Sequence, residues 1–200
     1  MPAAPALVYI HGFNSSPGSA KAQLFGAALA RHFPAVRYCV PALPAAPGVA
    51  AMNTLQRELD GLAAAGLQPV LLGSSLGGFY AAWLAEQRGL RAVLVNPVVR
   101  PHTLFAPYLG PQRNPYTGEH YELTRVHVDE LAGFAVERIS RVQDLLVLLQ
   151  TDDETLDWRD AWQHYAGCSL LKLVGGNHGF EHFEDVFPLI YRFAGLIPPP

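Results

Sequence analysis

The stretch PVLLGSSLGGFYAAWLA, residues 69–85, determines the fold that we expect. It begins with a short apolar run typical of a buried strand and ends with a run typical of a buried helix. Between the two runs, Gly73 and Gly77 flank Ser75 in a G-x-S-x-G pattern. That pattern fits a sharp strand-to-helix turn, which crowds its neighbours and therefore needs glycine on either side. Such a turn lifts the serine hydroxyl out of the sheet, where a base can reach it.

Length, composition and charge narrow the class of protein. The 200 residues suit one domain with a sizeable core, so we expect a single domain over residues 1–200. Apolar residues make up 50% of the chain and charged residues 16%, which fits a globular protein rather than a disordered one. The formal net charge is −3 and the sequence has no basic stripe. Neither nucleic acid nor an anionic membrane surface is therefore an expected partner.

The cysteines and the N-terminal sequence indicate a cytoplasmic location. Cys39 and Cys168 are too few for a disulfide framework, and we expect no bridge because their predicted strands lie far apart in the sheet. The first apolar run has no basic region before it and stops at His11, which is unlike a signal peptide. No apolar stretch approaches the length of a membrane span.

Short apolar runs predict six strands, over 6–10, 35–40, 69–73, 91–96, 144–150 and 169–174. Most of the runs are continuous rather than alternating, as in parallel strands that are buried on both faces. Helical patterns lie between the strands, one over 49–62 and another over 183–193. The alternation predicts an α/β protein with a doubly wound, mostly parallel six-stranded sheet.

One long segment after the fourth strand, residues 98–131, breaks the alternation. It holds several prolines and glycines among aromatic and aliphatic residues, and long irregular insertions of this kind are often functional. We expect it to form a cap over the site, with an ordinary packed loop as the alternative. The expected substrate contacts are Leu104, Phe105 and Tyr108 of this segment, together with Asn14 in the loop after the first strand.

The expected partners of Ser75 follow the last two predicted strands. His178 lies in the glycine-rich stretch GGNHGF (175–180), just past the strand 169–174. From there it can reach over the sheet edge as a general base. Three acids follow the strand 144–150, and one of them can accept a hydrogen bond from the imidazole. Asp153 is the first choice, Asp152 the nearest rival and Glu154 the third. One of these acids could also cap the helix that follows.

The loop after the first strand, HGFNSSP over 11–17, is expected to help bind a developing oxyanion. Gly12 lets the main chain turn without a Cβ clash, so that the Phe13 N–H can face the site. The Leu76 N–H, next to Ser75, is the expected second donor.

Metal and cofactor motifs are not expected. His178 and His182 are four residues apart, as in H-E-x-x-H, but Gly179 follows His178 and Glu181 is out of place for a general base. The sequence also contains no P-loop and no G-x-G-x-x-G after a strand.

These segments resemble the α/β-hydrolase superfamily and, more narrowly, the small YqiA-type esterases. The resembling pieces are YIHGFNSSP (9–17), GSSLGGFY (73–80), NP (96–97), NPYTGE (114–119), QTDDETLD (150–157) and GGNHGF (175–180). The resemblance implies a sheet order of 2-1-3-4-5-6 and a carboxylesterase with Ser75, Asp153 and His178 as its triad. Asp152 stands where such esterases often have glycine, which leaves the choice of acid open.

The expected function is hydrolysis of a small-molecule carboxylic ester or thioester through an acyl-enzyme intermediate, without a cofactor. Two alternatives stay open. One is a ligand-binding protein that keeps the fold without catalysis. The other is an acyl-CoA thioesterase or acyltransferase with the same triad, because one fold and one triad serve many substrates.

Overall fold

A six-stranded parallel sheet is the centre of the computed structural model, which describes residues 4–196. Its strands are β1 (Ala4–Ile10), β2 (Arg37–Cys39), β3 (Leu67–Ser74), β4 (Ala92–Val95), β7 (Leu145–Gln150) and β8 (Ser169–Leu173). They lie in the order β2-β1-β3-β4-β7-β8, and every neighbouring pair is parallel. Counted along the chain, these strands have the order 2-1-3-4-5-6, so the predicted fold class is confirmed.

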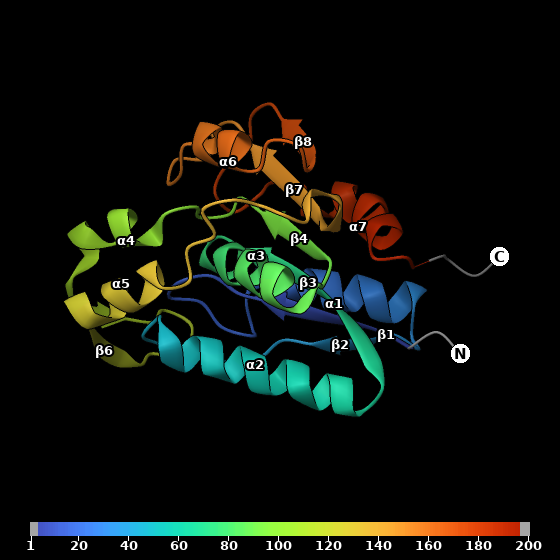
Figure 1. Ribbon diagram of the computed structural model, residues 1–200, viewed down its shortest axis with the longest axis horizontal. Helices are drawn as coiled ribbons and strands as arrows, with labels where there is room; N and C mark the ends of the chain where they lie inside the picture. The colour runs from blue at the N-terminus through green and yellow to red at the C-terminus, as the bar shows by residue number, and fades with distance from the viewer. Residues whose placement is uncertain (1–3, 197–200) are drawn as a thin grey trace.

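Helices cover both faces of this sheet (Figure 1). One face carries α1 (Ala20–His32) and α7 (Phe187–Phe193), and the other carries α2 (Val49–Ala64), α3 (Leu76–Arg88) and α6 (Trp158–His164). Successive strand side chains enter opposite layers. In β1, Leu7 and Tyr9 pack with α1 and α7, whereas Val8 and Ile10 pack with α2 and α3.

Two predicted helices differ in how closely the structure matches them. The helix predicted over 49–62 is present as α2, although Val49 at its start is 40% exposed. The stripe over 183–193 is not one helix but a 3₁₀ turn, η3 (Phe183–Val186), followed by α7. Pro188 explains the break, because proline lacks an N–H and its ring clashes with the carbonyl four residues earlier.

The sequence predicts an irregular segment over 98–131. In the structure this segment is largely folded into regular elements. It forms α4 (Pro101–Leu104), the turn η1 (Ala106–Tyr108), an antiparallel hairpin of β5 (Gly110–Arg113) and β6 (His120–Leu123), and α5 (Arg125–Ala132). The strands are short and half-exposed, and β5 contains a proline, so neither strand forms an apolar run in the sequence. Asn114 shapes the hairpin turn, since its Oδ1 accepts the N–H groups of Tyr116 and Thr117.

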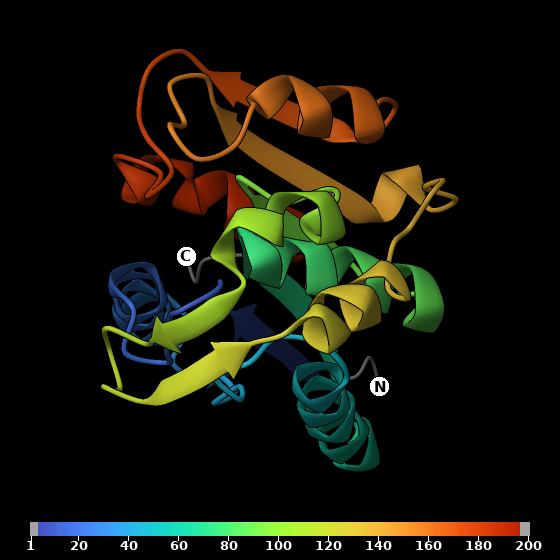
Figure 2. The same ribbon diagram turned by 90° about the vertical axis from the view of Figure 1, so that its left-hand side faces the viewer.

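The hairpin lies beside the loop that follows β1, as Figure 2 shows in yellow-green against blue. After α5 the chain returns through the 3₁₀ turn η2 (Val142–Asp144) to β7. Cys39 in β2 and Cys168 just before β8 lie at opposite edges of the sheet, and both are free. Within residues 4–196, no helix combines the length and the apolar character that a membrane span requires.

Candidate active site

Ser75 occupies a strained turn between β3 and α3. Its φ is 57° and its ψ is −121°, a main-chain conformation that residues other than glycine seldom adopt. The flanking glycines are required by packing. A Cβ added at Gly73 would collide with the main chain of Gly77, and a Cβ added at Gly77 would collide with the carbonyl of Ile10. The turn therefore places the Ser75 side chain at the carboxyl edge of the sheet.

Ser75, His178 and Asp153 form one chain of hydrogen bonds. Nε2 of His178 lies 3.0 Å from Oγ of Ser75, and Nδ1 lies 2.8 Å and 3.0 Å from the two oxygens of Asp153. A carboxylate only accepts, so Nδ1 carries the proton and Nε2 is free to accept from the serine hydroxyl. The Asp153 side chain is 2% exposed and that of His178 is 23% exposed. The structure thus brings together three side chains from the ends of three different strands.

The three neighbouring acids have different surroundings. Asp153 is fixed by its own turn, because its Oδ1 also accepts the main-chain N–H groups of Thr155 and Leu156. Asp152 is exposed, and its side chain accepts the hydroxyl of Thr151. Of the acids that the sequence offers, Asp153 is therefore the one that faces the imidazole.

Glu154 contacts the same histidine in another way. Its Oε2 accepts the main-chain N–H of His178 at 2.9 Å, and this hydrogen bond lowers the pKa of the Glu154 carboxyl. The helix α6 takes its N-cap from Asp157, whose side chain accepts the Arg159 N–H. The capping role that the sequence allows for one of the three acids thus falls to a fourth.

Two buried amides hold the loop that carries His178. Asn96, at the end of β4, donates from Nδ2 to the carbonyls of Asn177 and His178. Gln150, at the end of β7, accepts the N–H groups of Asn177 and Glu181. Both amides are also tied to each other, since Oδ1 of Asn96 accepts the Gln150 N–H. In the sequence, Asn96 and Gln150 each come as a polar residue at the end of an apolar strand. That pattern is the signal that could have predicted their role in holding the loop.

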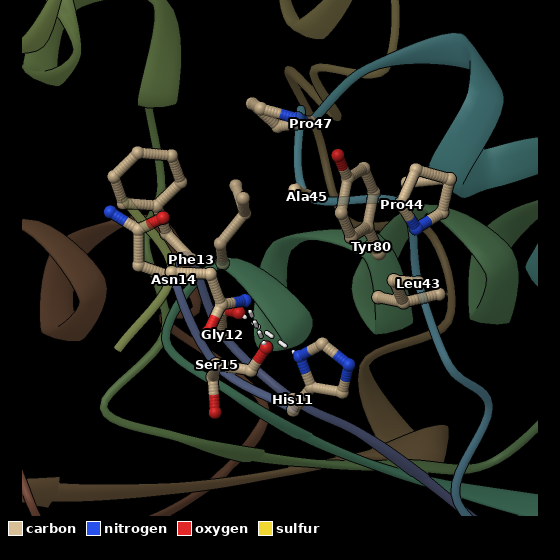
Figure 3. Close-up of a pocket in the computed structure, with 13 residues that line it drawn as sticks. His11, Gly12, Phe13, Asn14, Ser15, Leu43, Pro44, Ala45, Pro47 and Tyr80 are labelled. Carbon is tan, nitrogen blue, oxygen red and sulfur yellow. Dashed lines mark hydrogen bonds between the residues drawn. The ribbon is translucent and has the colours of Figure 1, made fainter. Parts of the chain in front are cut away.

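The loop after β1 passes directly beside Ser75. A Cβ added at Gly12 would lie 3.6 Å from the serine Oγ, so the main chain itself forms this wall of the site. Nδ1 of His11 lies 3.1 Å from the Gly12 carbonyl, and Figure 3 shows the other ring nitrogen turned away from that bond. Burial lowers the pKa of His11. Because a carbonyl oxygen only accepts, Nδ1 carries the proton in the bond to Gly12. A cavity of about 20 Å³ lies behind this loop, between His11, Leu43 and Tyr80 (Figure 3).

Asn14 links this loop to the hairpin. Its Oδ1 accepts the Tyr121 hydroxyl at 2.8 Å, and its Nδ2 donates to Gln112 at 3.2 Å. The φ of Asn14 is 49°, a left-handed conformation that asparagine tolerates better than most residues. Asn114 adds a third bond by donating to the Ser15 carbonyl. The insertion therefore holds the loop beside Ser75 in place.

A cleft of about 300 Å³ opens next to Ser75 and His178. Phe13 and Asn14 line it, together with Lys21 and Tyr116, which are not among the expected substrate contacts. Among the residues that the structure describes, Leu104, Phe105 and Tyr108 are not part of this lining. Phe105 is buried against Phe13 instead, with 4.7 Å between ring centroids.

Across positions 4–196, no group of three or more histidine, cysteine, aspartate or glutamate side chains could hold a metal ion. His182 is exposed and directly precedes η3.

The family model described as uncharacterised protein family UPF0227 matches residues 6–195. The chain belongs to UPF0227. Among solved structures, this UPF0227 chain is similar to Est1E from Butyrivibrio proteoclasticus, with a TM-score of 0.72 and 16% identity over 98% of this chain and 90% of that one. The esterase domain of a Rhodothermus marinus protein has a TM-score of 0.68 and 19% identity over 97% and 87% of the two chains.

A third solved structure comes from work on LipS and LipT, two metagenome-derived lipolytic enzymes. It has a TM-score of 0.71 and 16% identity, over 98% of this chain and 95% of that one. At such identities the likeness concerns the fold alone, and that fold is the α/β-hydrolase fold.

Proposed function

We propose that this UPF0227 member is a serine hydrolase that cleaves carboxylic esters or thioesters. The observation that carries the proposal is the hydrogen-bonded chain Ser75–His178–Asp153, with the serine on a strained turn at the sheet edge. A nucleophile next to a base that a third group orients is the arrangement that covalent acyl transfer requires.

In the first half of the cycle, Oγ of Ser75 attacks the carbonyl carbon while Nε2 of His178 takes the hydroxyl proton. The Asp153 carboxylate stabilises the imidazolium that forms. The tetrahedral intermediate collapses when the bond to the leaving oxygen or sulfur breaks, and Nε2 returns the proton to that atom. In the second half, His178 takes a proton from water as the water attacks the acyl-enzyme. The imidazolium then protonates Ser75, and the carboxylic acid leaves.

The oxyanion of the intermediate is assigned to the N–H groups of Phe13 and Leu76. Leu76 is the first residue of α3, so its N–H has no partner four residues earlier and lies at the positive end of the helix dipole. The Phe13 N–H belongs to the same peptide group as the Gly12 carbonyl and points the opposite way. Because His11 holds that carbonyl from one side, the N–H is directed to the other.

The structural neighbours support an ester substrate. Their names describe an esterase domain and lipolytic enzymes, and one structure of Est1E, with 14% identity and a TM-score of 0.72, holds ferulic acid. Ferulic acid is a carboxylic acid, which is the class of product that ester hydrolysis releases.

A fluorophosphonate probe and p-nitrophenyl esters of increasing chain length test this proposal. The wild-type protein should be labelled at Ser75 and should hydrolyse at least one ester, and Ser75→Ala should lose both, with kcat lower by about 10⁴-fold. Ser169→Ala, at an exposed position of β8, is the matched control and should behave as the wild type. Equal turnover by Ser75→Ala and the wild type would show that the serine is not the nucleophile. Absence of both labelling and turnover, with acyl-CoA included, would favour a ligand-binding protein.

A further inference from the structure

One wall of the cleft beside Ser75 carries a cation that the proposed hydrolysis does not use. Lys21, in the first turn of α1, lines the cleft together with Ser75 and His178. Its Nζ donates to the carbonyl of Gly179 at 2.8 Å and makes no ion pair within residues 4–196. No aspartate or glutamate is among the described residues that line this cleft.

The position of Lys21 is suited to a negatively charged ligand. Partial burial lowers the pKa of the Lys21 ammonium, and the nearby Asp153 carboxylate opposes that effect. Asp153 makes no ion pair with Lys21, because its oxygens accept from His178, Thr155 and Leu156 instead. A half-buried cation without a carboxylate partner favours an anion that enters the cleft.

The N-terminus of α1 adds a second source of positive potential. Ser19 is the N-cap residue, yet its hydroxyl makes no capping bond. The first hydrogen bond of the helix runs from the Gln23 N–H to the Ser19 carbonyl, so the N–H groups of Ala20 and Lys21 have no intrahelical partner. Both residues line the cleft, at the end of the helix where anions bind.

Ser19 itself is the independent sign of a ligand. The residue is 8% exposed and lines the cleft, and its Oγ is buried without a hydrogen-bond partner in the described part of the chain. Buried hydroxyls are almost always paired, because an unpaired one loses its hydrogen bonds to water without replacement. A ligand oxygen in the cleft would supply the missing partner.

We propose that Lys21, Ser19 and the N-terminus of α1 bind a carboxylate or phosphate group in the alcohol half of the substrate. The proposal rests on the proposed hydrolase function and names its substrate class. The alcohol half is indicated by Gly179, whose carbonyl holds the Lys21 ammonium and which directly follows His178. His178 gives its proton to the leaving group, so the leaving group lies on the same side of the cleft.

Matched esters test the proposal by kinetics. The substrates are 3-acetoxybenzoate and its neutral methyl ester, with p-nitrophenyl hemisuccinate and its methyl ester as the pair that carries the charge in the acyl half. The wild-type protein should prefer the anionic ester only in the first pair. Lys21→Gln should lower kcat/KM for 3-acetoxybenzoate by about tenfold or more beyond any change in kcat/KM for the neutral ester, the effect of losing a hydrogen bond to a charged group. Arg31→Gln, a cation lost from the exposed far end of the same helix, is the control.

An equal loss on the neutral ester would overturn the proposal, since Lys21 would then act only by holding Gly179. A preference for the anionic member of the acyl pair would overturn the assignment to the alcohol half. If Lys21→Gln retained the preference for 3-acetoxybenzoate, the assignment of Lys21 as the anion-binding residue would be overturned.

Binding separates this proposal from the proposed function. Benzoate and phenyl phosphate should bind to Ser75→Ala, measured by calorimetry, and binding should weaken by about tenfold when Lys21→Gln is added. The tighter of the two probes identifies the anion. If binding persists but no ester is turned over, the hydrolase proposal fails and the anion site stands; if Ser75-dependent turnover occurs without anion binding, the reverse holds.

Discussion

Asp153 faces His178 with both carboxylate oxygens, at 2.8 Å and 3.0 Å from the ring Nδ1. The same carboxylate closes its own turn by accepting the N–H groups of Thr155 and Leu156. The acid is therefore oriented by the main chain before it meets the histidine, and the exposed Asp152 next to it has no comparable support.

Replacing Asp153 should separate these two tasks. In Asp153→Asn, the amide oxygen can keep the turn while the amide NH₂ faces Nδ1 and favours the wrong tautomer. We expect kcat to fall by a factor on the order of 10⁴, with the urea midpoint close to that of the wild type. Asp152→Asn should retain activity. If Asp152→Asn were instead the inactive variant, the acid would have been assigned to the wrong residue.

Gly77, two residues after Ser75, should not tolerate replacement by alanine, whereas Gly61 in α2 should. Gly77→Ala places a Cβ against the Ile10 carbonyl, so we expect a loss of at least about 2 kcal/mol in the free energy of unfolding. Gly61→Ala, within α2 and with nothing within 4 Å of the added Cβ, should raise it by about 0.5–1 kcal/mol. Urea unfolding followed by circular dichroism compares the two. A stable Gly77→Ala protein would contradict the tight turn.

The bond between Tyr121 and Asn14 should connect the hairpin to catalysis. Tyr121→Phe keeps the ring and removes the hydroxyl that Asn14 accepts, so we expect a loss of about 1 kcal/mol in stability. Phe13, whose N–H we assign to the oxyanion, directly precedes Asn14 in the chain. We therefore also expect kcat to fall by up to about tenfold.

Two substitutions at Asn14 provide the comparison. Asn14→Gly adopts the left-handed conformation freely, whereas Asn14→Ala strains it, so the alanine variant should be the less active. Unchanged kcat in Tyr121→Phe, together with lower stability, would limit the hairpin to a structural role.

Glu154 should make a pH-dependent contribution to stability. The His178 N–H lowers the pKa of this carboxyl in the folded protein, so the stabilisation is present above the pKa of the unfolded chain. It is lost as the pH falls through the lowered folded value. The melting temperature of Glu154→Gln should therefore lie below that of the wild type near neutral pH, and the difference should shrink in acid. Glu122→Gln, an exposed acid on β6, should show no such trend.

The sheet and the main site residues could be predicted because each is marked by a local sequence pattern. Ser75 has its two glycines, and His178 follows an apolar strand within a glycine-rich loop. The choice among three adjacent acids needed the structure, because only the turn that Asp153 closes decides which carboxylate reaches the imidazole.

Lys21 and the hairpin are not marked by any such local sequence pattern. Lys21 lies on an ordinary helix, where a charged residue is normally expected to face solvent, and only the packing of α1 against the sheet brings it to the cleft. The hairpin escaped prediction because its strands are polar and short. Phe105, which the sequence predicts as a substrate contact, is buried against Phe13.

His178 and Ser75 are 103 positions apart in the chain, and nothing local brings them together. Their meeting requires β3, β7 and β8 to be docked in register, so the reactivity that we propose for the serine would arise only when the central sheet is complete. An activity-directed label would therefore report the fraction of molecules that have finished folding, in a denaturant series or in a cell extract.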